Sequence, residues 1–305
     1  MSTKPTLVVA LGGNALLKRG QPLEADLQQK NIELAAQQLA VLSQDWRIVL
    51  VHGNGPQVGL LALQNEAYQA TSPYPLDILV AETQGMIGYL LQQALHNYLP
   101  NCSAVCVITQ VLTDSDDPAY HSPNKYIGPS YLQEQLPYLD PTWQIKPDGD
   151  TFRRVVASPR PKKILETPAI ARLLEDDHLV ICCGGGGVPV IEQGSRLQGT
   201  PAVVDKDLAA ALLAEELDAD ALLILTDAKA VYLDWNTPQQ SAISDITCQE
   251  LNTITFDQGS MGPKVQACCA FVEKTQGIAA IGALDDALDI LNGKQGTRIH
   301  PSHSS

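Results

Sequence analysis

The chain has few aromatic and few basic side chains, and both shortages narrow the classes of protein that it fits. Phe, Trp and Tyr make up only 5% of its 305 residues, so a chain that is 45% hydrophobic must build its core mostly from Leu, Val, Ile and Ala. Its 20 Lys and Arg are outnumbered by 34 Asp and Glu, which gives a net charge of −14. We therefore expect neither nucleic acid nor an anionic membrane surface as a partner, because both are bound through clustered cations.

Signals for export, membrane insertion and metal binding are also missing from the sequence. Residues 1–5 carry no signal-peptide pattern, and no apolar run approaches membrane-spanning length. The 7 cysteines include two adjacent pairs but no C-x-x-C, and the histidines are scattered, so neither a disulfide framework nor a transition-metal cluster is indicated. We expect a cytoplasmic protein with reduced, mostly buried thiols and with no metal held directly by its side chains.

Short apolar runs alternate with helical patterns along most of the chain. This alternation predicts an α/β fold with an open, mainly parallel sheet and helices on both of its faces. The expected strands are 7–11, 48–51, 104–109, 179–183, 221–226 and 278–281, with a strand-like run at 202–204. The expected helices are 24–43, 58–69, 76–99, 208–216, 261–273 and 283–291. Thr247 and Glu250 form a capping-box pattern at a further helix start.

One segment, residues 114–163, interrupts this alternation. It is rich in Pro, Tyr and Asp and has no long helical period. An unstructured loop of that length is implausible in a compact domain, so we interpret the segment as a small protruding lobe, built of hairpins. The lobe is inserted in a single domain that spans residues 1–300, and we expect residues 301–305 to form a disordered tail.

Three glycine-rich turns follow predicted strands, at residues 12–14, 53–55 and 184–187. Strands of a parallel sheet end along one edge, so these turns should face one another. Glycine lets backbone N–H groups approach an anion closely, which makes this edge a candidate phosphate site. Each turn alone is equally well an ordinary tight turn. The chain contains no P-loop motif, and the spacing of Gly53, Gly55 and Gly59 does not fit the dinucleotide-binding fingerprint.

Two lysines occur at predicted helix starts that could reach the same edge. Lys206 stands between two aspartates after residues 202–204, and Lys264 follows a Gly-Pro pair in the segment 259–264. Either segment alone is typical of a solvated helix start. Together with the three turns they suggest positive charge beside a bound phosphate.

Eight motifs in this order resemble those of the carbamate kinase branch of the amino-acid kinase family, and they cover nearly the full length. They are A-L-G-G-N-A at 10–15, H-G-N-G-P-Q-V-G at 52–59, Q-G-M-I-G-Y at 84–89, K-x-I-G-P at 125–129, R-R-V-V-x-S-P at 153–159, C-G-G-G-G-V-P-V at 183–190, V-D-K-D-L-A-A-A-L-L-A at 204–214 and G-S-M-G-P-K-V at 259–265.

The resemblance implies a three-layer αβα fold with an eight-stranded sheet, a homodimer, and phosphoryl exchange between carbamate with ATP and carbamoyl phosphate with ADP. It also implies Mg²⁺ carried by the nucleotide phosphates, and a direction toward ATP in nitrogen catabolism. The chemistry is consistent, because phosphoryl transfer is catalysed mainly by positioning and positive charge. A carbamate oxygen is already anionic, so the reaction needs no general base, and no catalytic dyad is evident.

The resemblance also implies a role for individual residues. The catalytic charges are Lys125, Lys206, Asp207 and Lys264, with Asp207 orienting the lysines and Lys125 reaching over the site from the lobe. The backbone cradle of the transferred phosphoryl group is formed by Gly12, Gly13 and Asn14. Carbamate is bound by Gly53, Asn54 and Gly55. The nucleotide side is lined by Gly184, Gly185, Gly186, Thr226, Asp227, Tyr232 and Met261.

One departure from the family pattern lies beside the expected nucleotide. Where the family commonly has Val-Asp-Gly-Val-Tyr after Thr226-Asp227, this chain has Ala-Lys-Ala-Val-Tyr at 228–232. Lys229 reverses a charge there, which leaves nucleotide affinity open. Two alternatives therefore stand beside carbamate kinase: an enzyme of the same fold with another small acid as acceptor, and a nucleotide-binding paralogue with impaired catalysis. His52 and the basic run at 153–163 are assigned no catalytic role, since a structural histidine and a solvated hairpin face are the simpler interpretations.

Overall fold

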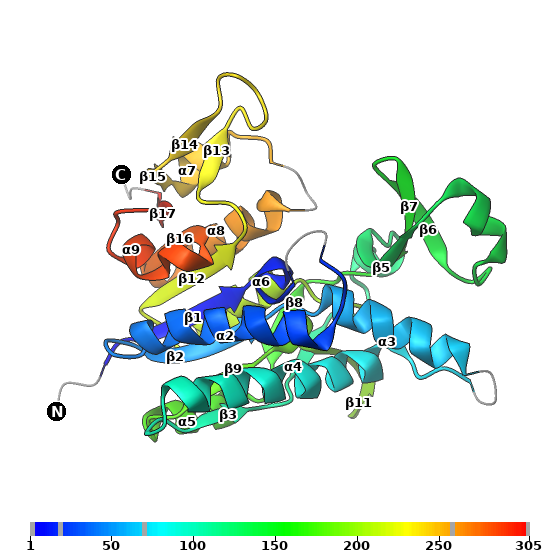
Figure 1. The fold of residues 1–305 in the computed structure, drawn as a ribbon, viewed down its shortest axis with the longest axis horizontal. Coiled ribbons are helices and arrows are strands. Elements are labelled where there is room, and N and C mark those ends of the chain that lie inside the picture. The colour runs from blue at the N-terminus through cyan, green and yellow to red at the C-terminus, as the bar shows by residue number, and fades with distance from the viewer. Residues whose placement is uncertain (1–3, 18–20, 69–71, 257–259, 303–305) are drawn as a thin grey trace.

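An eight-stranded sheet forms the centre of the protein in a computed structural model that describes residues 4–17, 21–68, 72–256 and 260–302 (Figure 1). Its strand order is β15 (Asp245–Thr247), β17 (Thr297–His300), β16 (Ile278–Ala283), β12 (Ala221–Thr226), β1 (Thr6–Leu11), β2 (Arg47–His52), β9 (Leu179–Cys182) and β3 (Ala104–Cys106). The strands from β16 to β3 run parallel, whereas β17 and β15 at one edge run in the opposite direction. The predicted mainly parallel sheet is confirmed.

Helices cover both faces of this sheet and bury the two sets of alternating strand residues. One face carries α2 (Ala25–Leu42), α4 (Leu76–Tyr98) and α9 (Ala287–Leu291), and the other carries α5 (Thr167–Glu175), α6 (Lys206–Glu216) and α8 (Met261–Thr275). In β1, Leu7, Val9 and Leu11 belong to the first core, and Val8 and Ala10 to the second. Successive side chains of β1 thus point alternately into the two cores, and both are apolar, as expected for a parallel sheet that is covered on both faces.

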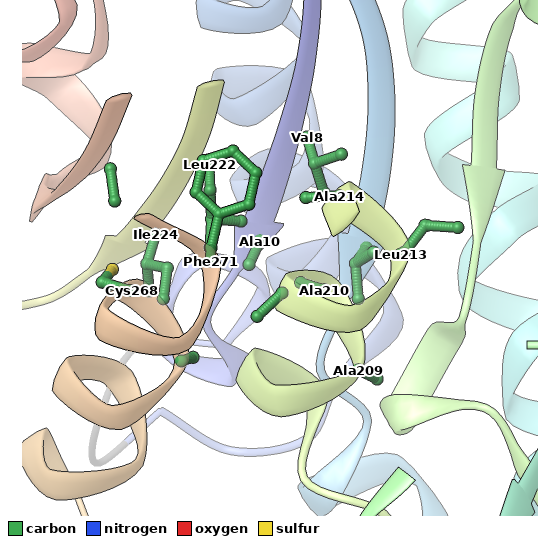
Figure 2. Packing of buried hydrophobic residues seen from close by; sticks show 14 of the residues in the cluster. Val8, Ala10, Ala209, Ala210, Leu213, Ala214, Leu222, Ile224, Cys268 and Phe271 are labelled. Atoms are coloured by element: carbon green, nitrogen blue, oxygen red, sulfur yellow. The ribbon is translucent and has the colours of Figure 1, made fainter. Parts of the chain in front are cut away.

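The second of these cores shows how a chain poor in aromatic residues packs its interior. Figure 2 shows Val8 and Ala10 of β1 facing α6, which presents the small side chains of Ala210 and Ala214. Small residues let the helix backbone lie close to the sheet without leaving voids, which native packing density requires. Phe271 of α8 is the largest fully buried side chain and fills the space over β12. The close packing of α6 against the sheet fixes the position of its first residues, Lys206 and Asp207.

Smaller sheets flank the central one. A four-stranded sheet has the order β11 (Arg196–Gly199), β10 (Val188–Gln193), β4 (Gln110–Thr113) and β8 (Pro161–Ile164). A hairpin is formed by β13 (Val231–Leu233) and β14 (Ser241–Ile243), and α7 (Cys248–Leu251) follows it. The predicted capping box at the start of α7 is confirmed: Glu250 N–H donates to Thr247 Oγ1, and Thr247 N–H donates to Glu250 Oε2.

The lobe sheet stands away from the main body (Figure 1). It consists of the antiparallel strands β5 (Lys125–Tyr131), β7 (Thr151–Val156) and β6 (Gln144–Asp148), all inside the segment 114–163. The last residues of that segment belong to β8 and so to the four-stranded sheet. Helix α3 (Gly55–Ala67) packs against β5, where a Cβ added to Gly59 would lie 2.4 Å from Cα of Gly128. Glycine at position 59 therefore lets the lobe strand lie directly on the helix.

Several sequence-based boundaries were wrong. The strand expected at 104–109 ends at Cys106, because the side-chain amide of Gln84 binds both the N–H and the C=O of Thr109 and directs the chain into β4. The run 202–204 forms an isolated bridge between Ala157 and Ala202 in place of a strand. The helix expected at 283–291 is α9 preceded by a 3₁₀ turn. Helix α5 and most strands of the smaller sheets were not predicted, since their apolar runs are short.

The remaining whole-chain expectations concern cysteines, membrane spans and the tail. Every cysteine is a free thiol, and Cys182, Cys183, Cys248 and Cys268 are buried. Among the described residues, no helix has both the length and the apolar character needed to cross a bilayer. In the expected tail 301–305, Ser302 donates from its N–H and its hydroxyl to Glu273, and residues 303–305 lie outside the described part of the chain.

Candidate active site

Two of the predicted glycine turns lie side by side at the ends of β1 and β2. These strands are neighbours, with Leu11 paired to His52 in register. A Cβ added to Gly53 would lie 3.0 Å from the backbone N of Gly13 and 3.5 Å from Cδ of Lys206. The two turns and the first residue of α6 thus meet at one point, and only glycine at position 53 allows so close an approach.

The backbone hydrogen bonds of these turns correct part of the predicted cradle. The N–H of Gly12 donates to Leu225 O at 2.9 Å, and the N–H of Gly53 donates to Leu11 O at 3.0 Å. Both groups therefore hold the turns to the sheet and are not free to bind an anion. Gly13 and Asn14 open the short helix α1 (Gly13–Leu16), whose first N–H groups have no acceptor within the helix. The side chain of Asn14 lies outside the described part of the structure.

Lys206 and Lys264 are joined by one carboxylate. Lys206 and Asp207 begin α6, while Lys264 lies in the first turn of α8. The ammonium of Lys206 donates to Asp207 Oδ1, and that of Lys264 donates to Oδ2 at 3.1 Å. Asp207 is only 3% exposed at its side chain, and each lysine is 12% exposed. Both ammonium groups are therefore fixed by the same buried acceptor.

Lys206, Asp207 and Lys264 form a group that we call the lysine triad, and the pKa values of its two lysines shift in opposite directions. Burial lowers the pKa of Lys206, and the nearby ammonium of Lys264 lowers it further against the attraction of Asp207. Burial also acts on Lys264, but the charge and hydrogen bond of Asp207 outweigh it and raise the pKa of Lys264. Two like charges held beside one carboxylate leave an excess of positive potential, which an anionic ligand would neutralise.

Lys125 reaches the same region from the lobe. Its ammonium donates to Asp205 Oδ2 at 2.6 Å, across 80 positions of sequence. Asp205 is the N-cap of α6, where its other oxygen accepts the N–H groups of Asp207 and Leu208. Burial raises the pKa of Asp205, but the charges of Lys125 and Lys206 outweigh it and bring the pKa down to about 2. The sequence alone indicated no further role for Asp205, because an Asp at a helix start is ordinary capping chemistry.

The third glycine turn packs against the 53–55 turn and the residue that precedes the N-cap of α6. A Cβ on Gly184 would lie 2.5 Å from the imidazole of His52, and one on Gly185 would lie 2.2 Å from Nδ2 of Asn54. A Cβ on Gly186 would lie 2.1 Å from the carbonyl oxygen of Val204. All three glycines are buried, so the turn packs under the 53–55 turn and against the start of α6. The missing side chains of these glycines make room for neighbouring protein groups, and their assignment to the nucleotide stays a prediction.

His52 and Asn54 are held inside this packing. His52 is 1% exposed, with Nδ1 3.0 Å from Gly53 O, and burial lowers its pKa to about 4. Asn54 is 3% exposed and donates through Nδ2 to Thr83 of α4 at 2.8 Å. Both side chains support the turn from below. Gln57, in the first turn of α3, is 2% exposed, and neither of its amide atoms has a partner among the described residues. A buried amide of this kind is a place where a ligand's polar atoms would be accommodated.

The buried His52 makes stability depend on pH. The unfolded imidazole takes up a proton below about pH 6.5, whereas the folded one does so only near pH 4, so the unfolded state binds more protons in between. We expect the free energy of unfolding to fall by about 3 kcal/mol from this group as pH drops from 7 to 4. In His52→Gln, urea unfolding at several pH values should show a drop in unfolding free energy that is smaller than that of the parent by about 3 kcal/mol. The unfolding free energy of the variant at pH 8, where histidine is neutral in both states, measures the packing that the substitution removes. A pH dependence equal to that of the parent would contradict the lowered pKa of His52.

The residues predicted for the nucleotide side lie at the ends of β12 and β13 and at the start of α8. Thr226 donates to Asp227 at 3.0 Å, and the charge of Asp227 acts on Lys264. Tyr232 is half-buried, with its ring 5.2 Å from that of Trp235, and Met261 packs against the core below α8. Lys229, the departure from the family pattern, is exposed in the loop between them. Of these residues, Asp227 is connected to the lysine triad through its charge, which acts on Lys264.

The basic run at 153–163 is largely neutralised within the lobe and its base. Arg153 pairs with Asp148 at 3.0 Å, Lys162 pairs with Asp114 at 2.7 Å, and Arg154 lies 3.6 Å from Glu66 of α3. Arg154 also stacks 4.2 Å over the ring of Trp143. These contacts agree with the simpler interpretation of the run as a hairpin surface.

Comparison with known proteins identifies the family. The sequence profile of the amino acid kinase family matches residues 5–281. A carbamate kinase of Escherichia coli K12 is 53% identical over 296 residues, covering 96% of this chain and 99% of the relative, and one of Haemophilus influenzae is 49% identical with 96% of both chains covered. The structure titled carbamate kinase from Giardia lamblia bound to AMP-PNP is 39% identical, covers 99% of this chain and 100% of its own, and superposes with a TM-score of 0.90. The chain therefore belongs to the amino acid kinase family, on its carbamate kinase branch.

Proposed function

We propose that this protein transfers a phosphoryl group reversibly between ATP and carbamate, giving carbamoyl phosphate and ADP. The observation that carries the proposal is that Asp207 holds the ammonium groups of both Lys206 and Lys264, while the stem of Lys206 lies at the adjoining turns of Gly13 and Gly53. A transferring phosphoryl group spreads negative charge over its oxygens, and fixed cations and amides at that position lower the barrier. The carbamate kinase relatives over nearly the full length support the same reaction.

Each group has a distinct task in this proposal. The N–H groups of Gly13 and Asn14 hold oxygens of the migrating phosphoryl group, and Gly12 keeps that turn attached to the sheet. Lys206 and Lys264 neutralise charge on the β- and γ-phosphates, while Asp207 keeps both ammonium groups in place. Lys125 supplies a third positive charge from the lobe. No side chain needs to remove a proton, because the attacking carbamate oxygen is already anionic.

Carbamate is small enough to be held mostly by backbone groups. We assign it to the turn formed by Gly53, Asn54 and Gly55, in which the Gly53 N–H holds the turn to the sheet. The buried Asn54 side chain and the 184–187 turn support this turn from below. Gln57 is a further candidate, because a primary amide offers both an acceptor for the carbamate amino group and donors for its carboxylate. A bulkier acid would require a more open turn, which disfavours an alternative acceptor.

The nucleotide is assigned to Thr226, Asp227, Tyr232 and Met261. Mg²⁺ would accompany the nucleotide and would offset the negative charge of its phosphates. Among the described residues, no group of three or more His, Cys, Asp or Glu could hold a metal ion. The carboxylates of Asp207 and Asp205 are occupied by lysines, so a nucleotide-carried Mg²⁺ fits the residues present better than a resident metal site.

The proposal also includes the domain organisation, the compartment, the direction of the reaction and the oligomeric state. Residues 1–300 act as one domain whose lobe at 114–163 covers the site, and the enzyme works in the cytoplasm, toward ATP. It forms a homodimer through the face of α4 that carries the exposed side chains of Ile78, Met86 and Tyr89. Exposed apolar side chains grouped on one helix are typical of an association surface, and the mass of the protein in solution tests this point.

The decisive experiment measures ATP formation from carbamoyl phosphate, ADP and Mg²⁺ by the purified protein. We expect turnover that depends on all three components and stops when EDTA removes the metal. Acetyl phosphate in place of carbamoyl phosphate tests for another small acid as acceptor, and we expect little ATP from it. Nucleotide binding without turnover would instead support the impaired paralogue, in which Lys229 would be the first residue to revert to the family's Asp.

A further inference from the structure

Asp205 connects two parts of the site that are far apart in sequence. Its Oδ1 accepts the N–H of Asp207 at 2.9 Å and that of Leu208 at 3.3 Å, which caps the helix carrying Lys206. Its Oδ2 accepts the ammonium of Lys125 at 2.6 Å. Asp205 is 8% exposed, so this double contact is made away from solvent. One carboxylate therefore touches both the lobe lysine and the helix start that bears the other catalytic charges.

Lys125 has few other constraints on its position. It is the first residue of β5, and its side chain is 35% exposed, about three times the exposure of Lys206 and Lys264. The lobe strand is attached to the body through α3, where Gly59 and Gly128 touch. A lysine on a flexible stem needs a fixed partner to hold its charge in one place. For Lys125 the partner that the structure provides is Asp205.

This contact offsets part of the positive charge of the site. Three ammonium groups, those of Lys125, Lys206 and Lys264, converge on the buried carboxylates of Asp205 and Asp207. Without Asp205, the like charges of Lys125 and Lys206 would repel each other before any anionic substrate arrived. The lobe would then be held open, or its lysine would turn toward solvent.

We propose that Asp205 is a positioning residue for phosphoryl transfer, which holds Lys125 of the lobe at a set distance from Lys206 through the N-cap of α6. The proposal rests on the proposed function. It predicts that the Asp205 carboxylate acts on catalysis through Lys125, and that it orders the lobe strand even without substrate.

The variant that separates these roles is Asp205→Asn. Asparagine is as good an N-cap as aspartate, so α6 stays capped, but the anionic partner of Lys125 is lost. We expect kcat to fall by about 100-fold, the scale of a misplaced catalytic group. In a Lys125→Ala background the same substitution should have less than about a twofold effect, because there is no longer a lysine to position. Equal losses in both backgrounds would overturn the proposal and leave Asp205 as a structural cap.

A matched control and a second readout keep the test independent of activity. The matched control is Asp148→Asn. Asp148 also pairs with a cation of the lobe, Arg153, but this pair lies within the lobe and does not connect it to α6. The control should therefore leave kcat unchanged. In the ligand-free protein, amide hydrogen exchange at β5 should be faster in Asp205→Asn than in the parent, with exchange along α6 unchanged. Unchanged exchange at β5 would overturn the positioning role. If the parent makes no ATP at all, the proposed function fails, and the exchange result still decides whether Asp205 holds the lobe.

Discussion

Replacing Lys206 by Met is expected to lower kcat by about a thousandfold, the upper range for loss of one preorganised electrostatic contact in a transition state. The side chain of Lys206 is 12% exposed, its stem lies beside Gly53, and its ammonium is bound by Asp207 Oδ1, whereas Lys264 is held at the other oxygen. Methionine keeps most of the stem's volume and removes only the charge. The measurement is steady-state ATP formation from carbamoyl phosphate and ADP, with kcat and KM determined separately.

The fold should survive this change, because Asp207 keeps Lys264 as a partner at 3.1 Å. We expect a loss in unfolding free energy below the about 3–5 kcal/mol seen when a buried charge is left unpaired. Lys274→Met is the matched control, since Lys274 of α8 pairs with Glu215 of α6 on the surface and lies outside the site. A Lys206→Met enzyme within tenfold of the parent, with Lys274→Met also normal, would show that this ammonium does not stabilise the transferring phosphoryl group.

Gly186→Ala is expected to cause the largest loss of stability of any single methyl addition considered for this protein. Its new Cβ would lie 2.1 Å from the carbonyl oxygen of Val204, a backbone atom that cannot move aside alone. The residue also has φ +90, which L-residues rarely adopt. Strained conformation and overpacking each cost about 1–3 kcal/mol, so we expect a total of about 2–6 kcal/mol. Urea unfolding of the purified variant measures this loss.

The clash also reaches the catalytic groups, because Val204 directly precedes Asp205 and Lys206. A shift of Val204 would displace the N-cap of α6, so kcat should fall even in molecules that remain folded. Gly194→Ala separates the two causes: Gly194 has a positive φ of 62, but a Cβ there meets no atom within 4 Å. It should show only the smaller conformational cost and normal activity. Equal stability losses in the two variants would mean that the contact with Val204 contributes nothing.

The positions of the catalytic lysines illustrate what sequence could predict. The placement of Lys206 and Lys264 at helix starts followed from local patterns, and the resemblance to carbamate kinases selected these two lysines and Lys125. That Asp207 orients both Lys206 and Lys264 was implied by the resemblance, and the hydrogen bonds to its two oxygens agree with it. The bond between Lys125 and Asp205 was missed, because no local pattern connects residues 80 positions apart.

The glycines show the opposite case, in which a local pattern leaves the neighbouring group open. Glycine after a strand permits close approach, but the sequence does not say which group approaches. At Gly53 the neighbours are the Gly13 turn and Lys206, as a phosphate site requires. At Gly185 and Gly186 the neighbours are Asn54 and Val204, so those glycines serve packing within the protein. Likewise, the N–H of Gly12 donates to Leu225 O, so Gly12 holds the turn to the sheet and does not offer this N–H to a phosphate.

The sequence by itself determined the class of fold, most elements of the central sheet and its helices, and the family. Hydrophobic periodicity and capping are local signals, and motifs retain their order along the chain whatever the packing. Only the tertiary structure decided which groups meet: one carboxylate between two lysines, another between the lobe and α6, and a glycine turn buried beneath the 53–55 turn. These pairings depend on distances between segments that the chain brings together only when both faces of the sheet are covered, and such distances leave no trace in local sequence.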